Sequence, residues 1–263
     1  MRETMISVAA VISAAGSSSR MGGVKKEYLP LGRAENSLTV LGAALSAFAS
    51  CPRIGLIVIS VPPDSGNGEA AARSCLPAEF LRGKGQERIL FVPGGRSRRS
   101  SVHNALLLLE KYHPSHVLIH DGARPWIKPA LIEKIIDAAI RYGAVIPALP
   151  MVETPKEFSG FPESVIKAEA DTQSGETAFI TRHLKRSRIC GAQTPQGFSF
   201  SELLAAHEKA AKREELENAE YTDDAEVWGE FIGKVAVIRG DPANRKITYP
   251  EDLLNSECGI KES

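Results

Sequence analysis

Three clusters of small and cationic residues could together bind a phosphate compound. The first cluster is SAAGSSSRMGGVKK, from Ser13 to Lys26, which follows an apolar run of small and β-branched residues. Small side chains let backbone N–H groups approach an anion closely, and Arg20 with Lys26 adds two full positive charges. A tight, solvated turn with surface cations would have the same composition, so this loop alone leaves both interpretations open.

The other two clusters follow later apolar runs. In PGGRSRRSS, from Pro93 to Ser101, paired glycines precede arginines and hydroxyls at the expected start of a helix, which also suits an anion. Ser97 capping that helix, with solvated arginines, is the alternative. In HDGARP, Asp121 ends an apolar strand. Mg²⁺ is typically held by one or two carboxylates plus substrate phosphates, so Asp121 is a candidate ligand. An Asp-stabilised turn with a local arginine is the alternative.

Other kinds of site have little support in the sequence. His113, His116 and His120 are separated by a proline and then enter a strand, so their side chains would not converge on zinc. No GxSxG elbow is present for catalysis by a serine nucleophile. The glycine pattern of dinucleotide-binding proteins is incomplete, and no acidic residue ends the second expected strand.

Composition limits the classes of partner. The chain has 263 residues, 43% of them hydrophobic, and 32 basic residues balance 32 acidic ones. No global field therefore attracts nucleic acid or an anionic membrane, and any anion site must be built locally. No apolar run approaches the roughly 20 residues of a spanning helix, and the N-terminus lacks the shape of a signal peptide. Four scattered cysteines without a CxxC pair favour reduced thiols and a cytoplasmic location.

Alternating apolar runs and helical periods predict the elements that carry these loops. β-branched runs predict strands, and apolar residues at three- and four-residue steps predict helices. The alternation favours a Rossmann-like α/β fold, with a mostly parallel sheet covered by helices on both faces. The predicted strands are Ser7–Ala14, Ile54–Val61, Ile89–Val92, Val117–His120, Ala144–Leu149 and Lys234–Ile238. The predicted helices are Ser37–Ser50, Glu69–Arg82, Ser97–Tyr112, Pro129–Arg141, Ser199–Glu217, Thr222–Ile232 and Pro250–Asn255.

The regular alternation breaks between about residues 152 and 188. This stretch is polar, rich in Thr, Glu, Lys and Ser, and contains no convincing core helix. The sequence shows no internal repeat and no low-complexity linker. We therefore predict a single domain over residues 1–263 with a protruding β-arm at about 152–188. In open α/β sheets ligands collect outside the carboxyl ends of the strands, where the three clusters are predicted to meet.

Eight short motifs occur together in the order and approximate spacing of one enzyme family. They are SAAGSSSRM, KKEYL, PGGRSRRSSV, HDGARP, ETPK, GAQTPQGF, TDDA and NRKITYPEDL, and they extend over about residues 8–254. Together they resemble the 2-C-methyl-D-erythritol 4-phosphate cytidylyltransferases of non-mevalonate isoprenoid biosynthesis. The resemblance implies a nucleotidyltransferase-type fold, Mg²⁺ as cofactor and a homodimer joined through the arm. It also implies that CTP and 2-C-methyl-D-erythritol 4-phosphate react to give the cytidine-diphospho product and diphosphate.

The resemblance also implies roles for individual residues. Asp121 would lie at the ribose and at Mg²⁺, and Thr154 and Arg186 would reach across the dimer. The catalytic cations would be Arg20, Lys26, Arg186 and Lys246. The nucleotide would be held by Ala14, Ala15, Gly16, Gly94, Gly95, Arg98, Ser101 and Asp121. The sugar phosphate would be held by Thr154, Arg186, Lys246 and Thr248.

Three departures from the family pattern leave roles open. Ser18 stands where the family usually has a second glycine. The family's Pro-Lys-Gln-Tyr is replaced by KKEY, in which spacing favours Lys26 as the catalytic lysine and Lys25 competes with it. Ala243 occupies a position that is often acidic in relatives. The second metal ligand is therefore left open, with Asp241 as a candidate.

Two other functions are compatible with the same motifs. A relative that activates a different alditol phosphate, such as ribitol 5-phosphate, would share the nucleotide motifs. The sugar-side segments ETPK and AQTPQ favour methylerythritol phosphate over it. A nucleotide-binding regulatory protein without catalysis is the second alternative. The combination of Arg20, a loop lysine and Asp121 argues against that alternative.

Overall fold

The chain divides into two compact units. The computed structural model describes residues 8–18, 21–32, 37–63, 67–82, 86–159 and 179–254. The first unit comprises Met1–Pro147 and Gln193–Ser263, and the second is Ala148–Ala192. The second unit contains the arm predicted at residues 152–188 and begins a few residues before it. Within the described ranges, no helix combines the length and the apolar character needed to cross a membrane.

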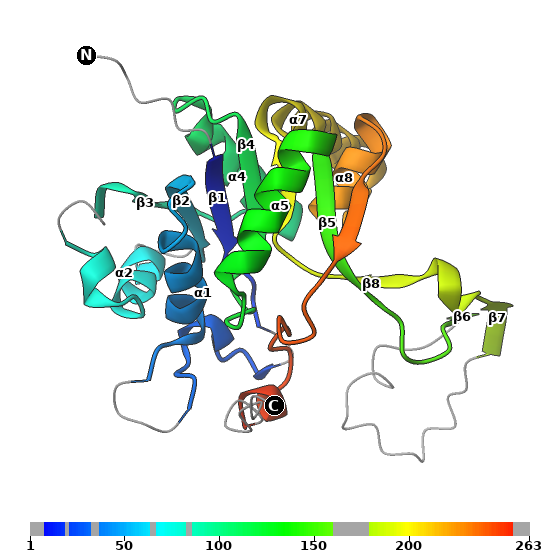
Figure 1. The fold of residues 1–263 in the computed structure, drawn as a ribbon, viewed down its shortest axis with the longest axis horizontal. Coiled ribbons are helices and arrows are strands. Elements are labelled where there is room, and N and C mark those ends of the chain that lie inside the picture. Colours follow the sequence, from blue (N-terminus) through cyan, green and yellow to red (C-terminus); the bar gives the residue numbers. More distant parts are fainter. Residues whose placement is uncertain are drawn as a thin grey trace. The chain divides into compact units, whose positions relative to one another are not determined.

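An eight-stranded sheet organises the chain (Figure 1). Its strands are β1 (Val8–Ser13), β2 (Ile54–Val61), β3 (Ile89–Pro93), β4 (His116–Asp121), β5 (Ala144–Pro150), β8 (Cys190–Ala192), β9 (Gln196–Ser199) and β10 (Ala236–Arg239). The order is β10-β5-β9-β4-β1-β2-β3, and β8 pairs with β5. Strands β1 to β4 run parallel, and β9 runs antiparallel to both β4 and β5. The predicted α/β fold with a mostly parallel sheet is therefore confirmed.

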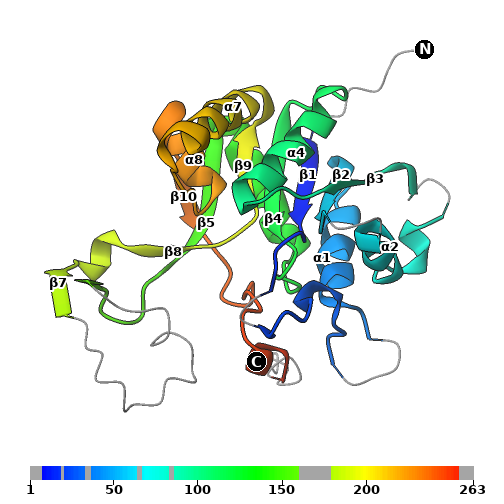
Figure 2. The ribbon, with the colours of Figure 1, turned by 180° about the vertical axis from the view of Figure 1, so that it is seen from behind.

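Helices cover both faces of the sheet. The helices are α1 (Val40–Ala49), α2 (Asn67–Ser74), α4 (Arg98–Glu110), α5 (Pro129–Tyr142), α7 (Phe200–Glu217), α8 (Asp224–Phe231) and α9 (Pro250–Leu254). Figure 1 shows α1 and α5 in front of the sheet, and Figure 2 shows α4, α7 and α8 on the opposite face. In β1, Val8, Ala10 and Ile12 pack toward α1 and α5. Ala9 and Val11 pack toward α4 and α7. Because successive side chains of a strand point to opposite faces, a strand covered on both must be apolar throughout.

Helix boundaries follow signals that the sequence carries. Ser97 caps α4: its side chain accepts a hydrogen bond from the amide of Ser100 at 3.0 Å, and the Ser100 hydroxyl accepts one from the amide of Ser97 at 2.8 Å. This reciprocal pair satisfies two otherwise unpaired amides. Helix α5 begins with Pro129 and ends at Gly143, whose φ of 79° side-chain-bearing residues rarely adopt. The interpretation of Ser97 as a helix cap is confirmed, and it makes Arg98 the first residue of α4.

The helix predicted over Glu69–Arg82 is wrong at its C-terminal end. Helix α2 stops at Ser74, and a separate 3-10 turn, η3 (Ala78–Phe80), follows Pro77. The proline ring disfavours helical geometry in the residue before it and removes an amide donor, so the helix cannot continue through this point. Leu76 and Phe80 continue a four-residue spacing of apolar residues across Pro77, which concealed the break.

Strand β9 was not predicted. It runs antiparallel between β4 and β5, and its sequence QGFS has one large apolar side chain, Phe198. Gly197 lets helix α5 approach the strand closely, because a Cβ there would lie 2.7 Å from Cγ2 of Ile135. Four residues with so little apolar character carry no strand signal on their own.

The second unit has a different character. It contains a two-stranded antiparallel sheet of β6 (Lys156–Ser159) and β7 (Phe179–His183), followed by the 3-10 turn η4 (Arg186–Arg188). Every residue of the two strands is exposed. The predicted β structure in this stretch is present, without a buried core among its described residues.

Candidate active site

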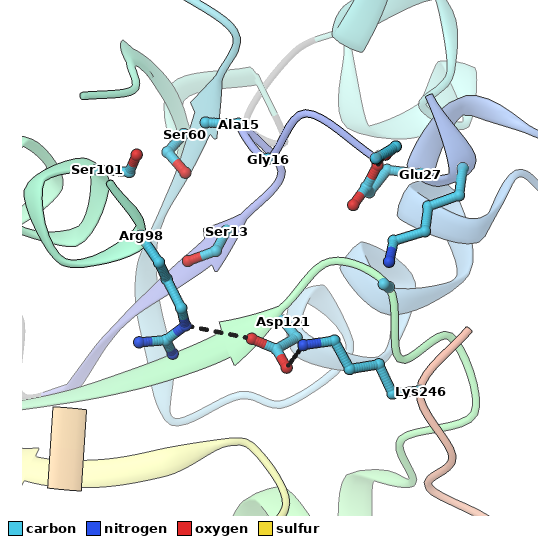
Figure 3. Close-up of a pocket in the computed structure, with 12 residues that line it drawn as sticks. Ser13, Ala15, Gly16, Glu27, Ser60, Arg98, Ser101, Asp121 and Lys246 are labelled. Carbon is cyan, nitrogen blue, oxygen red and sulfur yellow. Dashed lines mark hydrogen bonds and ion pairs between the residues drawn. The ribbon is translucent and has the colours of Figure 1, made fainter. Parts of the chain in front are cut away.

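A cavity of about 190 Å³ lies at the carboxyl ends of β1, β2 and β4 (Figure 3). Ser13 at the end of β1 pairs in register with Ser60 of β2 and with Asp121 of β4. All three residues line the cavity. Parallel strands present their carboxyl ends at one edge of the sheet, so the loops that follow them converge there.

Most residues assigned from the sequence to the nucleotide line this cavity. They are Ala15, Gly16, Arg98, Ser101 and Asp121, and two of the assigned catalytic cations, Lys26 and Lys246, line it as well. The assigned residues of the first unit that do not line it are Ala14, Gly94, Gly95 and Thr248. Arg20 lies outside the described residues. Thr154 and Arg186 belong to the second unit, where both are exposed.

Asp121 lies among three cations. Its Oδ2 is 2.9 Å from Nζ of Lys246 and 3.6 Å from Nε of Arg124, and its Oδ1 is 3.6 Å from Nε of Arg98. Burial alone would raise the pKa of Asp121, but the charges of Lys246, Arg98 and Arg124 outweigh it and hold that pKa well below its usual range. The carboxylate is therefore ionised, and it orients cations that an anionic ligand would also contact. Figure 3 shows Arg98 and Lys246 on opposite sides of it.

Lys246 reaches the cavity because its loop is tied to the end of β4. The amide of Ile247 donates to the carbonyl of Ala123 at 2.9 Å. The guanidinium of Arg124 donates to the carbonyl of Asn244 at 2.8 Å, joining residues that are 120 positions apart. These bonds fix the backbone on both sides of Lys246, so its ammonium group is presented in a defined place.

Buried polar residues hold the backbone of Asp121 in turn. Its amide donates to Oγ1 of Thr194 at 3.0 Å, so the Thr194 hydroxyl is left to donate to Nδ1 of His120 at 3.0 Å. The opposite ring nitrogen, Nε2, then donates to the carbonyl of Arg124 at 3.1 Å. Burial lowers the pKa of His120 to about 4, which keeps the ring neutral. Both nitrogens of His120 are occupied, so this ring acts as a structural residue.

The two lysines of KKEY occupy different places. Lys26 lines the cavity. Lys25 donates from Nζ to the carbonyl of Gly16 and lies 3.9 Å from Oε2 of Glu27. Glu27 also accepts a hydrogen bond from the Ser18 hydroxyl at 3.3 Å. Lys25 and Glu27 thus fasten the first loop to the 3-10 turn η2 (Lys26–Tyr28), which supports Lys26 as the lysine that meets phosphate.

Gly94 and Gly95 determine how closely two loops pack. A Cβ on Gly94 would collide with Cβ of Ala15 and lie 3.2 Å from the carbonyl of Val61. The amide of Gly95 donates to Oγ of Ser101 at 3.0 Å, and that hydroxyl donates to the carbonyl of Ser97 at 2.8 Å. The glycines therefore let the loop after β1 and the loop after β3 pack against each other and form the cavity wall.

Several lining residues were not predicted. Ser13, Ser18, Glu27, Ser60 and Ala123 also face the cavity. The Oγ atoms of Ser13 and Ser60 are buried, and neither has a hydrogen-bond partner among the described residues. The sequence did contain a signal for these two serines, because each is a polar residue near the end of an apolar run, VAAVIS or IGLIVISV. A hydroxyl at the carboxyl end of a strand is well placed to bind a ligand.

Asp241 does not supply the second carboxylate of the cavity. Its Oδ2 lies 3.2 Å from Nζ of Lys128, and its Oδ1 accepts from the amide of Ala243 at 2.8 Å. It is absent from the described residues that line the cavity. Glu27 is the second acidic side chain that does line it.

Comparisons with known proteins cover nearly the whole chain. The family model described as "IspD: 2-C-methyl-D-erythritol 4-phosphate cytidylyltransferase" matches residues 8–262. The enzyme of that name from Pelotomaculum thermopropionicum is 35% identical over 260 residues, which are 98% of this chain and 95% of that protein. A "Bifunctional enzyme IspD/IspF" from Bradyrhizobium sp. is 37% identical over 257 residues, which are 97% of this chain and 57% of that protein. The chain thus spans about half the length of such bifunctional relatives.

Solved structures agree with the sequence comparison. The 4-diphosphocytidyl-2C-methyl-D-erythritol synthase of Anaerococcus prevotii has a TM-score of 0.73 at 25% identity, covering 96% of this chain and 95% of that one. The 2-C-methyl-D-erythritol 4-phosphate cytidylyltransferase of Thermus thermophilus has a TM-score of 0.65 at 27% identity, covering 94% and 96%. Motifs, fold and relatives all agree, and the chain belongs to the 2-C-methyl-D-erythritol 4-phosphate cytidylyltransferase family.

Proposed function

We propose that this chain transfers the cytidylyl group of CTP to 2-C-methyl-D-erythritol 4-phosphate and releases diphosphate. The observation that carries the proposal is the cavity at the strand ends, which Lys26 lines together with Lys246 and Arg98, two of the cations that pair with the ionised Asp121. An excess of fixed cations in a confined cavity suits a polyphosphate. The family to which the chain belongs gives the identity of the nucleotide and of the acceptor.

The reaction needs no general base. The second pKa of a phosphate monoester is about 6, so the acceptor is already mostly a dianion near neutral pH. One of its oxygens attacks the α-phosphorus of CTP, a new P–O bond forms, and the bond to the β-phosphate oxygen breaks with its electron pair on the leaving diphosphate. The neutral, fully engaged His120 is consistent with a site in which no proton is removed.

Catalysis would come from positioning and from fixed positive charge. The acceptor dianion and the triphosphate repel each other, and negative charge grows on the α-phosphoryl oxygens and on the leaving group. Lys26 and Lys246, which both line the cavity, would reduce this repulsion. The hydroxyls of Ser13 and Ser60, which have no hydrogen-bond partner within the described ranges, are available to donate to the nucleotide. Contacts of Arg20 with the triphosphate stay a prediction.

The donors in the cavity fit Mg²⁺ as the cofactor. Asp121 and Glu27 both line it, and Mg²⁺ in phosphoryl-transfer sites is held by one or two carboxylates plus substrate phosphates. In the described part of the chain, no three His, Cys, Asp or Glu side chains group as metal ligands. When bound by these carboxylates, Mg²⁺ would supply positive charge that offsets the negative charge of the leaving diphosphate. Lys246 and Arg98 keep Asp121 ionised for that contact.

The second unit supports assembly into a homodimer. Its strands expose Phe158, Phe179 and Ile180, with relative exposures of 48%, 72% and 54%. A two-stranded sheet with exposed apolar side chains is marginal in water by itself, so a second copy covering it would stabilise the arm. Thr154 and Arg186 would then hold the acceptor phosphate, together with Lys246 and Thr248. The free thiols of Cys51, Cys75 and Cys190 favour a reducing compartment such as the cytoplasm.

Diphosphate release by the purified protein tests the proposal. The assay uses Mg²⁺, each of the four nucleoside triphosphates, and either methylerythritol phosphate or ribitol 5-phosphate as acceptor. We expect release with CTP and methylerythritol phosphate. Preference for ATP or UTP would refute the cytidine assignment, and preference for ribitol 5-phosphate would refute the acceptor. CTP binding without release would identify a non-catalytic nucleotide-binding protein.

A further inference from the structure

Two consecutive arginines at the start of α4 make ion pairs in different directions. Arg98 lines the cavity, and its Nη2 lies 2.8 Å from Oδ2 of Asp224. Arg99 pairs instead with Glu214 of α7 at 2.6 Å, away from the cavity-lining residues. With 3.6 residues per turn, consecutive helical side chains point about 100° apart, which separates the two guanidinium groups. The chain therefore contains two neighbouring arginine–carboxylate pairs, and one of them reaches the proposed active site.

Asp224 is held from two sides. It is the first residue of α8 and is fully buried. Its Oδ2 faces Arg98, and its Oδ1 lies 3.2 Å from Nε2 of His207, which is also fully buried. A carboxylate in such a place is strongly destabilising unless it is paired. Burial alone would raise the pKa of Asp224, but Arg98 and His207 lower it, so the group stays ionised. The Arg98–Asp224 pair thus has little freedom to rearrange.

The two oxygens of Asp121 depend on different cations. Lys246 and Arg124 both face Oδ2, whereas Arg98 faces Oδ1 through Nε at 3.6 Å. Arg98 uses its Nη2 for Asp224 and its Nε for Asp121, so one planar group joins the two carboxylates. Displacement of the Arg98 guanidinium would remove the contact between its Nε and Oδ1 of Asp121. The Asp121 carboxylate could then rotate about its last side-chain bond.

We propose that Asp224 is a positioning residue, which fixes Arg98 so that Arg98 in turn fixes the Asp121 carboxylate. Arg98 is then a bridge between two acidic residues rather than a flexible clamp for the triphosphate. The sequence placed Arg98 at the nucleotide, and its position in the cavity agrees with that. The sequence did not show that a buried carboxylate, that of Asp224, holds Arg98 in place. The kinetic tests of this inference rest on the proposed function, whereas its structural test does not.

The first test compares two isosteric substitutions at the two pairs. Asp224→Asn removes the charge behind Arg98, and Glu214→Gln removes the matched charge behind Arg99. We expect Asp224→Asn to lower kcat about 10- to 100-fold, the range for residues that orient a contacting group, with the KM for methylerythritol phosphate nearly unchanged. Glu214→Gln should retain kcat within about twofold even if it melts at a lower temperature. Equal losses of kcat in the two variants would overturn the proposal.

A double-mutant cycle tests whether Asp224 acts through Arg98. In an Arg98→Met background, Asp224→Asn should cause no further loss of kcat, because the residue through which it acts is gone. Losses that multiply would overturn the proposal. The double variant removes both charges of the pair together, so it should be less destabilised than Arg98→Met alone, which leaves the buried Asp224 without its arginine. Melting curves of all four proteins identify any variant whose loss comes from unfolding.

A crystal structure of the Asp224→Asn protein gives a readout that needs no activity. We expect the Arg98 guanidinium to move away from Asp121, so that Nε and Oδ1 separate beyond their present 3.6 Å. An Arg98 that keeps its place would overturn the positioning role. Failure of the wild-type protein to release diphosphate would refute the proposed function and leave this structural test intact.

Discussion

The cavity and the second unit distribute their polar residues in opposite ways. Around the cavity the charges are paired and the carboxylate among them is buried: Asp121 is 9% exposed and lies among three cations. In Ala148–Ala192, Thr154 and Arg186 are exposed, and Arg186 donates to the carbonyl of Val152 at 2.8 Å. Charges that are fixed before the ligand arrives need no reorganisation, whereas exposed side chains must be ordered by whatever binds them. If the proposed function is right, the nucleotide half of the site, which is the cavity of the first unit, is preorganised, and the acceptor half, which includes Thr154 and Arg186, must be ordered by assembly or by the ligand.

Removing Lys26 should have the largest effect on turnover, because it removes a fixed positive charge from the preorganised cavity. We expect Lys26→Ala to lower kcat by about 100- to 1000-fold, or about 3–4 kcal/mol, the cost of one lost transition-state contact. Lys25→Ala is the matched control. Lys25 fastens the loop at Gly16, so its loss should raise the KM for CTP about tenfold and spare most of kcat. Diphosphate-release kinetics measure both, and near-normal turnover in Lys26→Ala would contradict the assignment.

The acceptor half can be broken at Arg186. We expect Arg186→Ala to lower kcat/KM for methylerythritol phosphate about 100-fold, because a charge-assisted contact to phosphate is lost, with the KM for CTP unchanged.

Mixing two inactive variants sharpens this prediction. If the arm of one protomer serves the cavity of the other, a heterodimer of Lys26→Ala and Arg186→Ala chains has one intact site and one doubly mutated site. Random reassociation should then restore about a quarter of wild-type activity. If each arm served its own cavity, every site would carry one mutation and mixing would restore nothing. Gel filtration establishes that the variants assemble.

The sequence predicted the nucleotide half well, because topology brings its parts together. Once a parallel sheet is inferred, the loops after β1, β3 and β4 must meet at one edge, and the structure places Gly16, Arg98 and Asp121 there. Lys246 lies in the segment after the predicted strand Lys234–Ile238, where no local pattern marked it as a site residue. Only the family resemblance located it, since its position depends on bonds such as that between Arg124 and Asn244.

Contacts between distant helices were beyond prediction. The pairing of Arg98 with Asp224 depends on how α8 packs beside α4, which no local pattern of TDDA specifies. Strand β9 was missed for a related reason: QGFS becomes a strand because β4 and β5 supply partners on both sides. Local propensity is weak in such short segments, and tertiary context decides their structure.

The burial of polar groups in the first unit should also appear in its response to acid. Burial, with further effects of His207 and Arg99, lowers the pKa of His103 in α4 to about 4 from its ordinary value of 6.5. Between these values the unfolded chain binds a proton that the folded chain does not, so stability falls as pH falls from about 6.5 toward 4. The loss should be about 2 kcal/mol, less than the full shift because the ring is partly exposed.

Urea unfolding at several pH values measures this loss. In a His103→Gln variant the fall in unfolding free energy between pH 7 and pH 4 should be smaller by that amount, because the side chain no longer titrates. An unchanged slope would show that the acid response arises elsewhere, for example from carboxylates such as Asp224, whose protonation lies lower in pH.

Gly94→Ala should have the smallest effect, and it probes how tightly the walls of the cavity are packed. The added methyl group would collide with Cβ of Ala15, so either the two loops separate or the contact is strained. We expect a loss of about 1 kcal/mol in unfolding free energy, at the low end for overpacking because a single methyl group is added, and a several-fold higher KM for CTP. Gly229→Ala in α8 is the control, since a Cβ there meets nothing within 4 Å. A Gly94→Ala protein with wild-type KM and stability would show that the cavity is less rigid than the paired charges around Asp121 imply. The cavity and the exposed second unit would then differ less in preorganisation.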